Sequence, residues 1–257
     1  MSKEVLFEVE DNIGIITINR PNENNAFSKS MLAKWLQYLK TVKEDDSIKA
    51  MILTGKGKVF CTGGSIKEMA NGELSGWKMK KFLTDFVHKI ALEMKTLYKP
   101  TLAAINGYAI GAGLDMALMC DFRIAVENAV FGESYIKLGL VAGDGGCFLL
   151  PRIIGVPRAL ELLLTSRFIG SDTALDWGLI NLIVPDNEKL LSESIKFLKN
   201  ITQFPDEAVK LMKQLVYNSL NENFEEHLSK VSSHMGMLSQ RDEFYNNAKK
   251  LLKKISS

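Results

Sequence analysis

Two glycine-rich stretches each join a predicted strand to a predicted helix. In residues 60–69 a Gly-Gly pair follows an apolar strand segment, and in residues 106–121 a Gly-Ala-Gly run does the same. Glycine lets a ligand approach the backbone closely, and the first N–H groups of a helix have no internal partner. Both stretches can therefore present N–H donors to a developing negative charge. For either stretch alone, a tight turn without chemistry is the alternative.

Together the two stretches resemble the crotonase superfamily, also called the enoyl-CoA hydratase/isomerase family. The resemblance covers nearly the whole chain and rests on the order of its motifs, in residues 19–26, 60–69, 99–121, 131–146 and 174–184. It implies an α/β fold, a crotonase-type spiral of ββα units with a C-terminal α-helical oligomerisation region. It also implies a homotrimer or homohexamer with an acyl-CoA site near a subunit boundary.

The same resemblance implies a set of backbone contacts with the thioester. The N–H groups of Gly64 and Ala112 are expected to form an oxyanion hole, which agrees with their positions where strands lead into helices. Many members carry an acid where this chain has Ser65, and Lys67 is either a phosphate contact or a surface lysine. The expected CoA- and substrate-binding residues are Ala26, Thr62, Gly63, Gly64, Ser65, Ile66, Lys67, Gly111 and Ala112.

The acidic residues depart from the family pattern. A hydratase of this family uses two glutamates, which align here with Asp115 and Tyr135. The aspartate is one methylene shorter than glutamate, or about 1.5 Å on the scale of a C–C bond. Tyrosine has an ordinary pKa of about 10, so it is a poor base near neutral pH but a good hydrogen-bond donor. The two-glutamate hydration mechanism is therefore not expected in its usual form.

Two further acids are candidates to replace the missing glutamates. Asp144 lies in the glycine loop 142–146, which supplies catalytic acids in several family branches, although one residue later than an ungapped alignment requires. Its alternative role is a helix cap. Glu133 precedes Tyr135 by two residues, which places both on one face of a strand, and its alternative is a surface position. The predicted catalytic residues are Asp115, Asp144, Tyr135 and Glu133, with the two aspartates handling protons and Tyr135 orienting substrate or water.

Composition excludes several other classes of protein. The chain has 257 residues, 46% hydrophobic residues and a formal net charge of +2, so no nucleic-acid partner is expected. Its three cysteines lack metal-ligand spacing, and an odd number argues against a disulfide framework. The three histidines are scattered and are interpreted as surface or helix-packing residues. No apolar run matches a signal region or a membrane span. We expect a cytoplasmic protein with no metal and no cofactor other than the CoA of its substrate.

The predicted secondary structure supplies the frame that positions these residues. Residues 5–10 and 14–19 are predicted strands joined at Asp11-Asn12, Ser28 is a predicted helix cap, and residues 77–98 form a predicted helix. Strands and helices alternate until Pro185, after which only amphipathic helices are predicted. The chain is therefore divided into a core with the acyl-CoA site, residues 1–185, and a helical trimerisation region, residues 186–257.

These observations predict an enzyme that transforms an acyl-CoA. An enoyl-CoA hydratase or isomerase is expected, acting through a thioester enolate held by the oxyanion hole but lacking the usual glutamate pair. Carbon–carbon bond chemistry, as in a decarboxylase or a condensing crotonase, is the alternative among enzymes. A catalytically silent acyl-CoA-binding protein is the alternative outside them.

Overall fold

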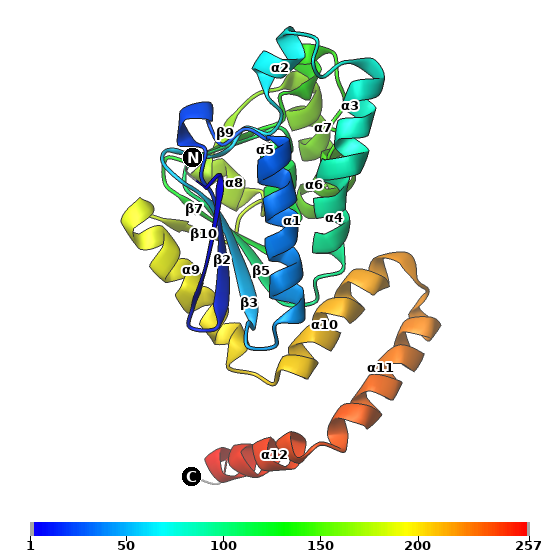
Figure 1. Cartoon of the computed structure of the whole chain (residues 1–257). Coiled ribbons are helices and arrows are strands. Elements are labelled where there is room, and N and C mark those ends of the chain that lie inside the picture. Colours follow the sequence, from blue (N-terminus) through cyan, green and yellow to red (C-terminus); the bar gives the residue numbers. More distant parts are fainter. Residues whose placement is uncertain (1–2, 256–257) are drawn as a thin grey trace.

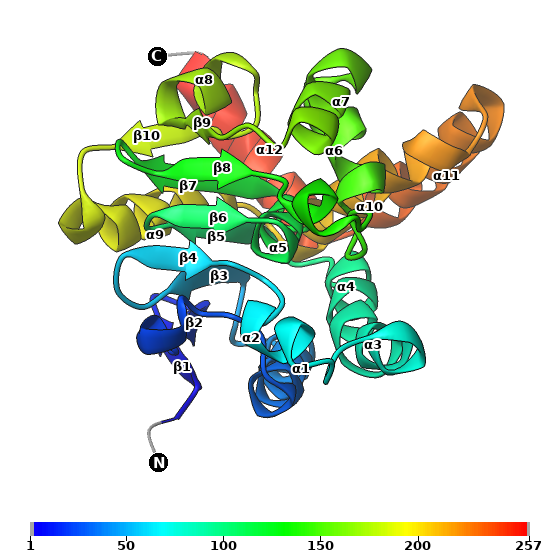
Figure 2. The ribbon, with the colours of Figure 1, turned by 90° about the horizontal axis from the view of Figure 1, so that it is seen from above.

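The computed structural model describes residues 3–255 and contains two sheets (Figures 1 and 2). The larger sheet has the order β1-β2-β3-β5-β7-β10 and is parallel except for the β1–β2 hairpin. Its strands are Val5–Glu10, Ile13–Ile18, Ala50–Gly55, Thr101–Ile105, Phe122–Val126 and Leu182–Val184. The smaller sheet has the order β4-β6-β8-β9, with strands Val59–Cys61, Tyr108–Ile110, Val130–Gly132 and Ile169–Gly170.

A repeated unit relates the two sheets. A long strand of the larger sheet is followed by a short strand of the smaller sheet and then by a helix, as in β3–β4–α2 and β5–β6–α5. Figure 2 shows β3 beside β4, β5 beside β6 and β7 beside β8, so the chain advances by one pair of strands per unit. The helices of these units are α2 (Ile66–Ala70), α5 (Ala112–Leu118), α6 (Gly146–Ile154), α7 (Val156–Thr165) and α8 (Ser171–Asp176). The predicted α/β class is confirmed.

Local sequence signals explain several boundaries. Asp11 and Asn12 both have positive φ, which suits the tight β1–β2 turn, and the predicted hairpin is confirmed. Ser28 accepts a hydrogen bond from the Met31 N–H and caps α1 (Lys29–Glu44), as predicted. The predicted helix over 77–98 is present as α3 (Gly76–Phe82), a π-type turn (Leu83–Val87) and α4 (His88–Lys95).

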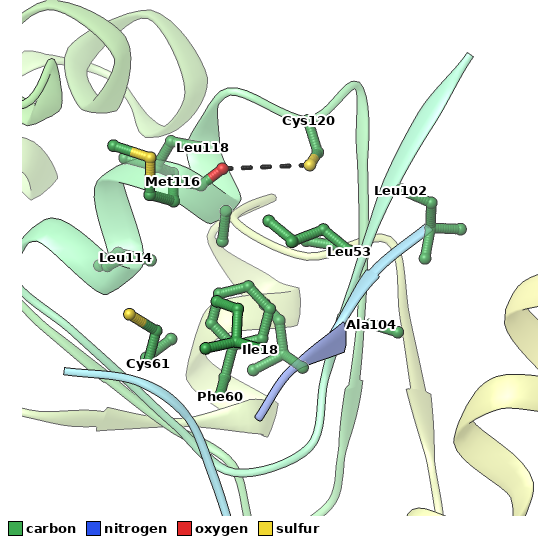
Figure 3. Close-up of a cluster of buried hydrophobic side chains, with 14 of the residues drawn as sticks. Ile18, Leu53, Phe60, Cys61, Leu102, Ala104, Leu114, Met116, Leu118 and Cys120 are labelled. Carbon is green, nitrogen blue, oxygen red and sulfur yellow. Dashed lines mark hydrogen bonds between the residues drawn. The ribbon is translucent and has the colours of Figure 1, made fainter. Parts of the chain in front are cut away.

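The core lies between the two sheets and around α5. Strands β2, β3 and β5 are almost entirely buried, as is usual for parallel strands covered on both faces. All seven residues of α5 are buried. Figure 3 shows side chains of β2, β3, β4, β5 and α5 gathered in one apolar cluster, which includes Phe60, Leu102 and Leu114. The acid Asp115 is therefore carried by a helix that is otherwise apolar.

The C-terminal helices divide into two groups. Helix α9 (Asn187–Thr202) packs on the larger sheet and buries Leu190, Ile195 and Leu198. Helix α10 (Asp206–Asn218) stays in contact with the core, where Lys213 and Tyr217 bond Asp121, and α11 (Phe224–Ser239) and α12 (Asp242–Ile255) then run away from it (Figure 1). The predicted C-terminal helical region is confirmed, whereas the division near residue 185 and the role in oligomerisation stay predictions. No helix within residues 3–255 is both long and apolar enough to cross a bilayer.

Three short 3-10 turns complete the described chain. They span Pro21–Glu23, Tyr135–Leu138 and Ser219–Asn221. The second of these, η3, follows β8 and carries Tyr135. Because β8 ends at Gly132, Glu133 and Tyr135 do not share a strand. The prediction that both side chains lie on one face of a strand is therefore wrong.

Candidate active site

The two glycine-rich stretches lie directly against each other. A Cβ atom added to Gly63 would be 2.5 Å from the Cβ atom of Ala112, and one added to Gly113 would be 2.0 Å from the carbonyl oxygen of Cys61. Side chains at these two positions would push the beginning of α5 away from the end of β4. Glycine therefore allows the close approach of two junctions that are about 50 residues apart in the sequence.

The backbone N–H groups of Gly64 and Ala112 are free at this contact. Ala112 is the first residue of α5 and follows Gly111, whose φ of 53° turns the chain into the helix. Within residues 3–255 neither N–H group donates to another group of the chain. Ala112 thus provides one of the unpaired donors that begin every helix. The assignment of both groups to an oxyanion hole stays a prediction.

The loop before α1, residues 19–28, contacts the glycine-rich stretch at Thr62 and Gly63. The Phe27 N–H donates to the Gly63 carbonyl at 2.7 Å, and the Thr62 hydroxyl donates to the Asn24 carbonyl at 3.2 Å. Ala26 therefore lies beside Thr62 and Gly63, as the resemblance implied. The buried Asn25 was noted only as part of a motif, yet its side-chain amide donates to the carbonyls of residues 56, 59 and 60 and fixes this loop on β4.

The remaining predicted CoA contacts lie at the start of α2. The Ser65 hydroxyl accepts a hydrogen bond from the Glu68 N–H at 3.3 Å and caps the helix. A serine at this position therefore serves the local fold in place of the acid that many family members carry. Ile66 and Lys67 are exposed on the first turn of α2. Their contacts with CoA stay predictions.

All four predicted catalytic side chains come together beside this junction. The Tyr135 hydroxyl donates toward Asp115 Oδ2 at 2.7 Å and toward Asp144 Oδ2 at 3.1 Å. The Tyr135 ring lies 3.7 Å from the position of a Cβ atom on Gly111, so it is next to the free Ala112 N–H. Asp115 is fully buried, and Glu133 and Asp144 are 1% and 5% exposed.

Two of the alternatives left open by the sequence are wrong. Glu133 is not a surface residue, because it is buried behind Asp115. Asp144 is not the cap of α6, because Gly145 occupies the cap position and no side chain bonds to the first turn. Its backbone loop instead turns the Asp144 carboxyl inward, toward Tyr135. The sequence could not decide either point, since both depend on the path of the loops after β8.

The acid cluster, defined as Asp115, Glu133, Tyr135 and Asp144, contains polar atoms without hydrogen-bond partners. Within the described chain, both carboxyl oxygens of Glu133, Oδ1 of Asp115 and Oδ1 of Asp144 are buried and unpaired. Buried polar atoms are nearly always paired in folded proteins. Asp115 and Glu133 contact each other, and a hydrogen bond between two carboxyl groups needs a proton on one of them. The unpaired oxygens therefore indicate that the cluster holds protons.

Burial changes the protonation of the cluster. It raises the pKa of Asp115 to about 7, with the Asp144 charge acting in the same direction and the Tyr135 hydrogen bond opposing it. Burial and the neighbouring Asp115 raise the pKa of Glu133 well above its usual range. Burial also raises the pKa of Asp144, against the hydrogen bond from Tyr135 and the charge of His88. Near neutral pH the cluster therefore retains protons that exposed acids would have released.

His88 is a site residue that the sequence interpretation missed. Its Nε2 atom lies 3.0 Å from the Gly143 carbonyl oxygen and 4.0 Å from Asp144 Oδ1. His88 begins α4 directly after the π-type turn, a helix irregularity that is frequent at functional sites. It is 56 positions from Asp144 in the sequence. No local spacing relates the two residues, so only the folded chain brings them together.

An apolar cavity of about 430 Å³ opens next to the junction. A Cβ atom on Gly64 would be 2.5 Å from Met69 Cε, so one wall of the cavity adjoins the predicted oxyanion donor. The opposite wall is formed by Leu138 and Leu140, which follow Tyr135 in the sequence. The cavity is lined by Ile66, Met69, Ala70, Leu74, Ser75, Gly76, Met79, Leu138 and Leu140. Within residues 3–255, no three His, Cys, Asp or Glu side chains are grouped to hold a metal ion.

Comparisons with known proteins identify the family of the chain. The family model described as enoyl-CoA hydratase/isomerase matches residues 8–250. A probable enoyl-CoA hydratase of Mycobacterium bovis is 35% identical over 242 residues, which cover 94% of this chain and 88% of that protein. A 4-chlorobenzoyl coenzyme A dehalogenase of an Arthrobacter species is 32% identical over 222 residues, or 85% of this chain and 79% of that protein.

A solved structure extends the likeness to three dimensions. The enoyl-CoA hydratase of Bacillus anthracis has a TM-score of 0.91 and 28% sequence identity, covering 98% of this chain and 96% of that one. Relatives with different reaction names have similar identities, so overall likeness does not select the reaction. It does confirm the resemblance on which the sequence interpretation rested: the chain is an enzyme that belongs to the enoyl-CoA hydratase/isomerase family.

Proposed function

We propose that this enzyme hydrates or isomerises an enoyl-CoA through a thioester enolate. The observation that carries the proposal is the pair of free N–H groups, Gly64 and Ala112, beside a buried cluster of acids. Fixed N–H donors stabilise negative charge on a carbonyl oxygen more strongly in a site closed to water. The positions of the donors and acids match the two requirements of enolate chemistry.

Asp115 and Asp144 handle the protons in this mechanism, and Tyr135 orients them. Burial raises the pKa of Asp115 to about 7, close to the pH at which a general acid or base is most effective, and burial also raises the pKa of Asp144. Glu133 contacts Asp115, and burial and that neighbour raise the pKa of Glu133 well above its usual range, so it supports Asp115 as a proton-holding neighbour. The mechanism requires no metal and no cofactor beyond the CoA of the substrate.

The substrate carries an apolar acyl group that occupies the cavity beside Gly64. Its lining is almost wholly aliphatic, and Ser75 is the one hydroxyl-bearing residue among the lining residues. The CoA moiety lies along the loop at Ala26 and the start of α2. The proposed location of the protein is the cytoplasm. The proposed assembly is a trimer or hexamer, since α10 to α12 expose apolar residues that another subunit can cover.

A substitution of the Ala112 donor tests this function. Proline is tolerated at the first residue of a helix but has no N–H group, so Ala112→Pro should remove the donor while α5 persists. Turnover on a series of 2-enoyl-CoA thioesters should fall by about 10²–10³-fold, the effect of losing one oxyanion donor. Ala112→Gly keeps the N–H group and is the matched control, with circular dichroism to check the fold of both variants.

Three outcomes would count against the proposal. Equal turnover of the Ala112→Pro and Ala112→Gly variants would remove the donor from the mechanism. Parent enzyme that binds acyl-CoA thioesters by calorimetry without converting any of them would favour a silent binding protein. Release of chloride from 4-chlorobenzoyl-CoA in the absence of enoyl-CoA turnover would favour the activity named for the Arthrobacter relatives.

A further inference from the structure

The hydroxyl group of Tyr135 lies between two carboxyl groups. Its oxygen is 2.7 Å from Asp115 Oδ2 and 3.1 Å from Asp144 Oδ2. A phenol has one hydrogen and can also accept a hydrogen bond. It can donate to only one of these carboxylates at a time. The other contact is a hydrogen bond only if that carboxyl is protonated and donates to the phenol oxygen.

Two proton arrangements satisfy both contacts. In the first, protonated Asp115 donates to Tyr135, and Tyr135 donates to ionised Asp144. In the second, protonated Asp144 donates to Tyr135, and Tyr135 donates to ionised Asp115. The two arrangements have the same net charge and differ only in which acid holds the proton, so the fold does not need to change when they interconvert.

The groups around the two acids favour the retention of one shared proton. Two nearby carboxyls in a dry site do not both ionise readily, and Asp115 and Asp144 are both nearly inaccessible to solvent. Tyr135 itself stays protonated, because burial and the neighbouring acids raise its pKa. The other titratable groups that face this pair are Glu133 after β8, Cys61 at the end of β4 and His88 in α4, and Cys147 in α6 faces Glu133.

His88 makes the two acids unequal. It lies beside Asp144, at 4.0 Å from Oδ1, and the side chains of the two residues are 40% and 4% exposed. A positive charge on His88 stabilises the ionised form of Asp144. This neighbour favours the arrangement in which Asp115 holds the shared proton and Asp144 is the base. The asymmetry gives the pair a defined starting state before substrate binds.

We propose that Tyr135 relays a proton between Asp115 and Asp144 and thereby resets the two acids between turnovers. In the resetting step, the O–H bond of Asp144 breaks and its proton moves to the Tyr135 oxygen, while the Tyr135 O–H bond breaks and its proton moves to Asp115. The phenol is neutral before and after the step. This step restores the first arrangement, in which Asp115 holds the proton, and no solvent molecule or co-reactant is consumed.

The relay rests on the proposed function and deepens it. When one acid takes a proton from the substrate and the other delivers one, both acids end the cycle in the wrong protonation state. Asp115 has no access to bulk water, so it cannot recover by direct exchange. Transfer through Tyr135 returns the pair to its starting state. Tyr135 is a positioning residue in this scheme, since it acts on the acids and not on the reacting carbon atoms.

Tyr135→Phe tests the relay by removing the hydroxyl while keeping the ring. With enzyme in excess over an enoyl-CoA, the single turnover should remain within a few-fold of the parent. Under multiple turnover the rate should fall by about 10²-fold, the smaller end of the contribution of a positioned acid or base. Tyr108→Phe is the matched control, because Tyr108 is a half-exposed tyrosine on β6 outside the cluster. Equal losses in both regimes, or no loss, would overturn the relay.

Two measurements on the parent protein keep the proposal testable if Tyr135→Phe does not fold. The dependence of multiple-turnover rate on the deuterium content of the solvent should be curved, because two protons move in the resetting step, and a linear dependence would contradict it. Carboxyl ¹³C signals of Asp115 and Asp144 should both respond in each titration step of the free protein. Independent titration would overturn the shared proton. Shared titration in a protein without turnover would refute the proposed function alone.

Discussion

Folded proteins usually bury apolar side chains and expose charged ones. The acid cluster breaks the second half of this rule, and the C-terminal extension, defined as α10 to α12, breaks the first. The acid cluster buries three carboxyl groups with unpaired oxygens. The extension instead exposes large apolar side chains, including Phe224, Met235 and Ile255. Buried polar groups cost free energy unless they are paired, and exposed apolar groups forgo the stabilisation of burial.

The difference indicates what each region lacks in the isolated chain. In the acid cluster the carboxyl oxygens lack donors, and protons retained on the acids can supply part of what is missing. In the extension the missing partner is an apolar surface of large area, which a second copy of the chain can supply. We therefore expect the acid cluster to serve the proposed chemistry and the extension to serve the proposed assembly, and separate substitutions test each expectation.

The largest expected effect is on stability, from Asp115→Asn. The pKa of Asp115 is raised in the folded state from its ordinary 3.8 to about 7. Between these values the unfolded chain releases a proton that the folded protein keeps, so the free energy of unfolding falls as pH rises from about 4 to about 7. Asparagine does not titrate. The variant should therefore gain stability over the parent across this range, by at most about 4 kcal/mol at about 1.4 kcal/mol per pKa unit.

Urea denaturation at pH 5 and pH 8 measures this gain. Asp242→Asn, at the exposed start of α12, is the control and should follow the parent at both pH values. If the free energies of unfolding of Asp115→Asn and the parent differ by the same amount at pH 5 and at pH 8, Asp115 is not kept protonated by burial. The contrast between the acid cluster and an ordinary surface acid would then disappear.

The next effect is on catalysis. Asp115→Asn and Asp144→Asn should each reduce turnover of enoyl-CoA by about 10²-fold or more, the scale of a positioned acid or base. Affinity for acyl-CoA should change little, because binding depends on backbone donors. Glu133→Gln should have a smaller effect, since Glu133 is protonated near neutral pH and glutamine keeps a neutral group there.

Steady-state kinetics together with calorimetry separates these roles. Full activity of Asp144→Asn would remove that residue from the mechanism and leave Asp115 as the acid or base. Full activity of both aspartate variants would refute the assignment of proton handling to the acid cluster. A loss in Glu133→Gln as large as that in Asp115→Asn would mean that Glu133 itself exchanges protons.

The third prediction concerns the extension. Light scattering should give a mass close to a multiple of three subunits. The double variant Leu228→Glu with Met235→Glu places two charges on one face of α11, where both side chains are exposed in the single chain. It should reduce the mass towards that of a monomer. Ser233→Glu, on another face of the same helix, should leave the mass unchanged.

A parent protein that is monomeric at micromolar concentration would contradict this interpretation of the extension. Loss of assembly by Ser233→Glu would show that added charge, and not the loss of an apolar face, causes dissociation. Unchanged turnover in a dissociated double variant would show that the acid cluster works without the neighbouring subunit.

The smallest effect is on the length of the acyl group. Exposed apolar residues near the active site differ from those of the extension because they line a cavity. Ala70→Phe should fill part of this cavity and shift the preference towards shorter enoyl-CoA thioesters. Each methylene of the acyl group that is no longer buried in the cavity costs about 0.8 kcal/mol of binding free energy, or roughly fourfold in affinity. An unchanged ranking of chain lengths by kcat/KM would show that the acyl group lies elsewhere.

The sequence alone determined the fold class, the β1–β2 hairpin, the Ser28 cap and the two glycine-rich junctions. These features depend on neighbours within a few residues: the alternation of apolar side chains, the residues that tolerate positive φ, and the side chains that pair with the first N–H groups of a helix. The departures from the family pattern at Asp115 and Tyr135 were also readable from residue identity.

Only the tertiary structure decided how the acids meet. The inward path of the chain after β8 buries Glu133 and turns Asp144 towards Tyr135. His88 reaches Asp144 from α4, a helix that ends at Lys95. Such contacts depend on the stacking of two sheets and on the packing of α5 between them. The sequence shows which residues have side chains that can exchange protons. The distances between these side chains, which decide how they shift one another's pKa values, arise only when distant segments fold against one another.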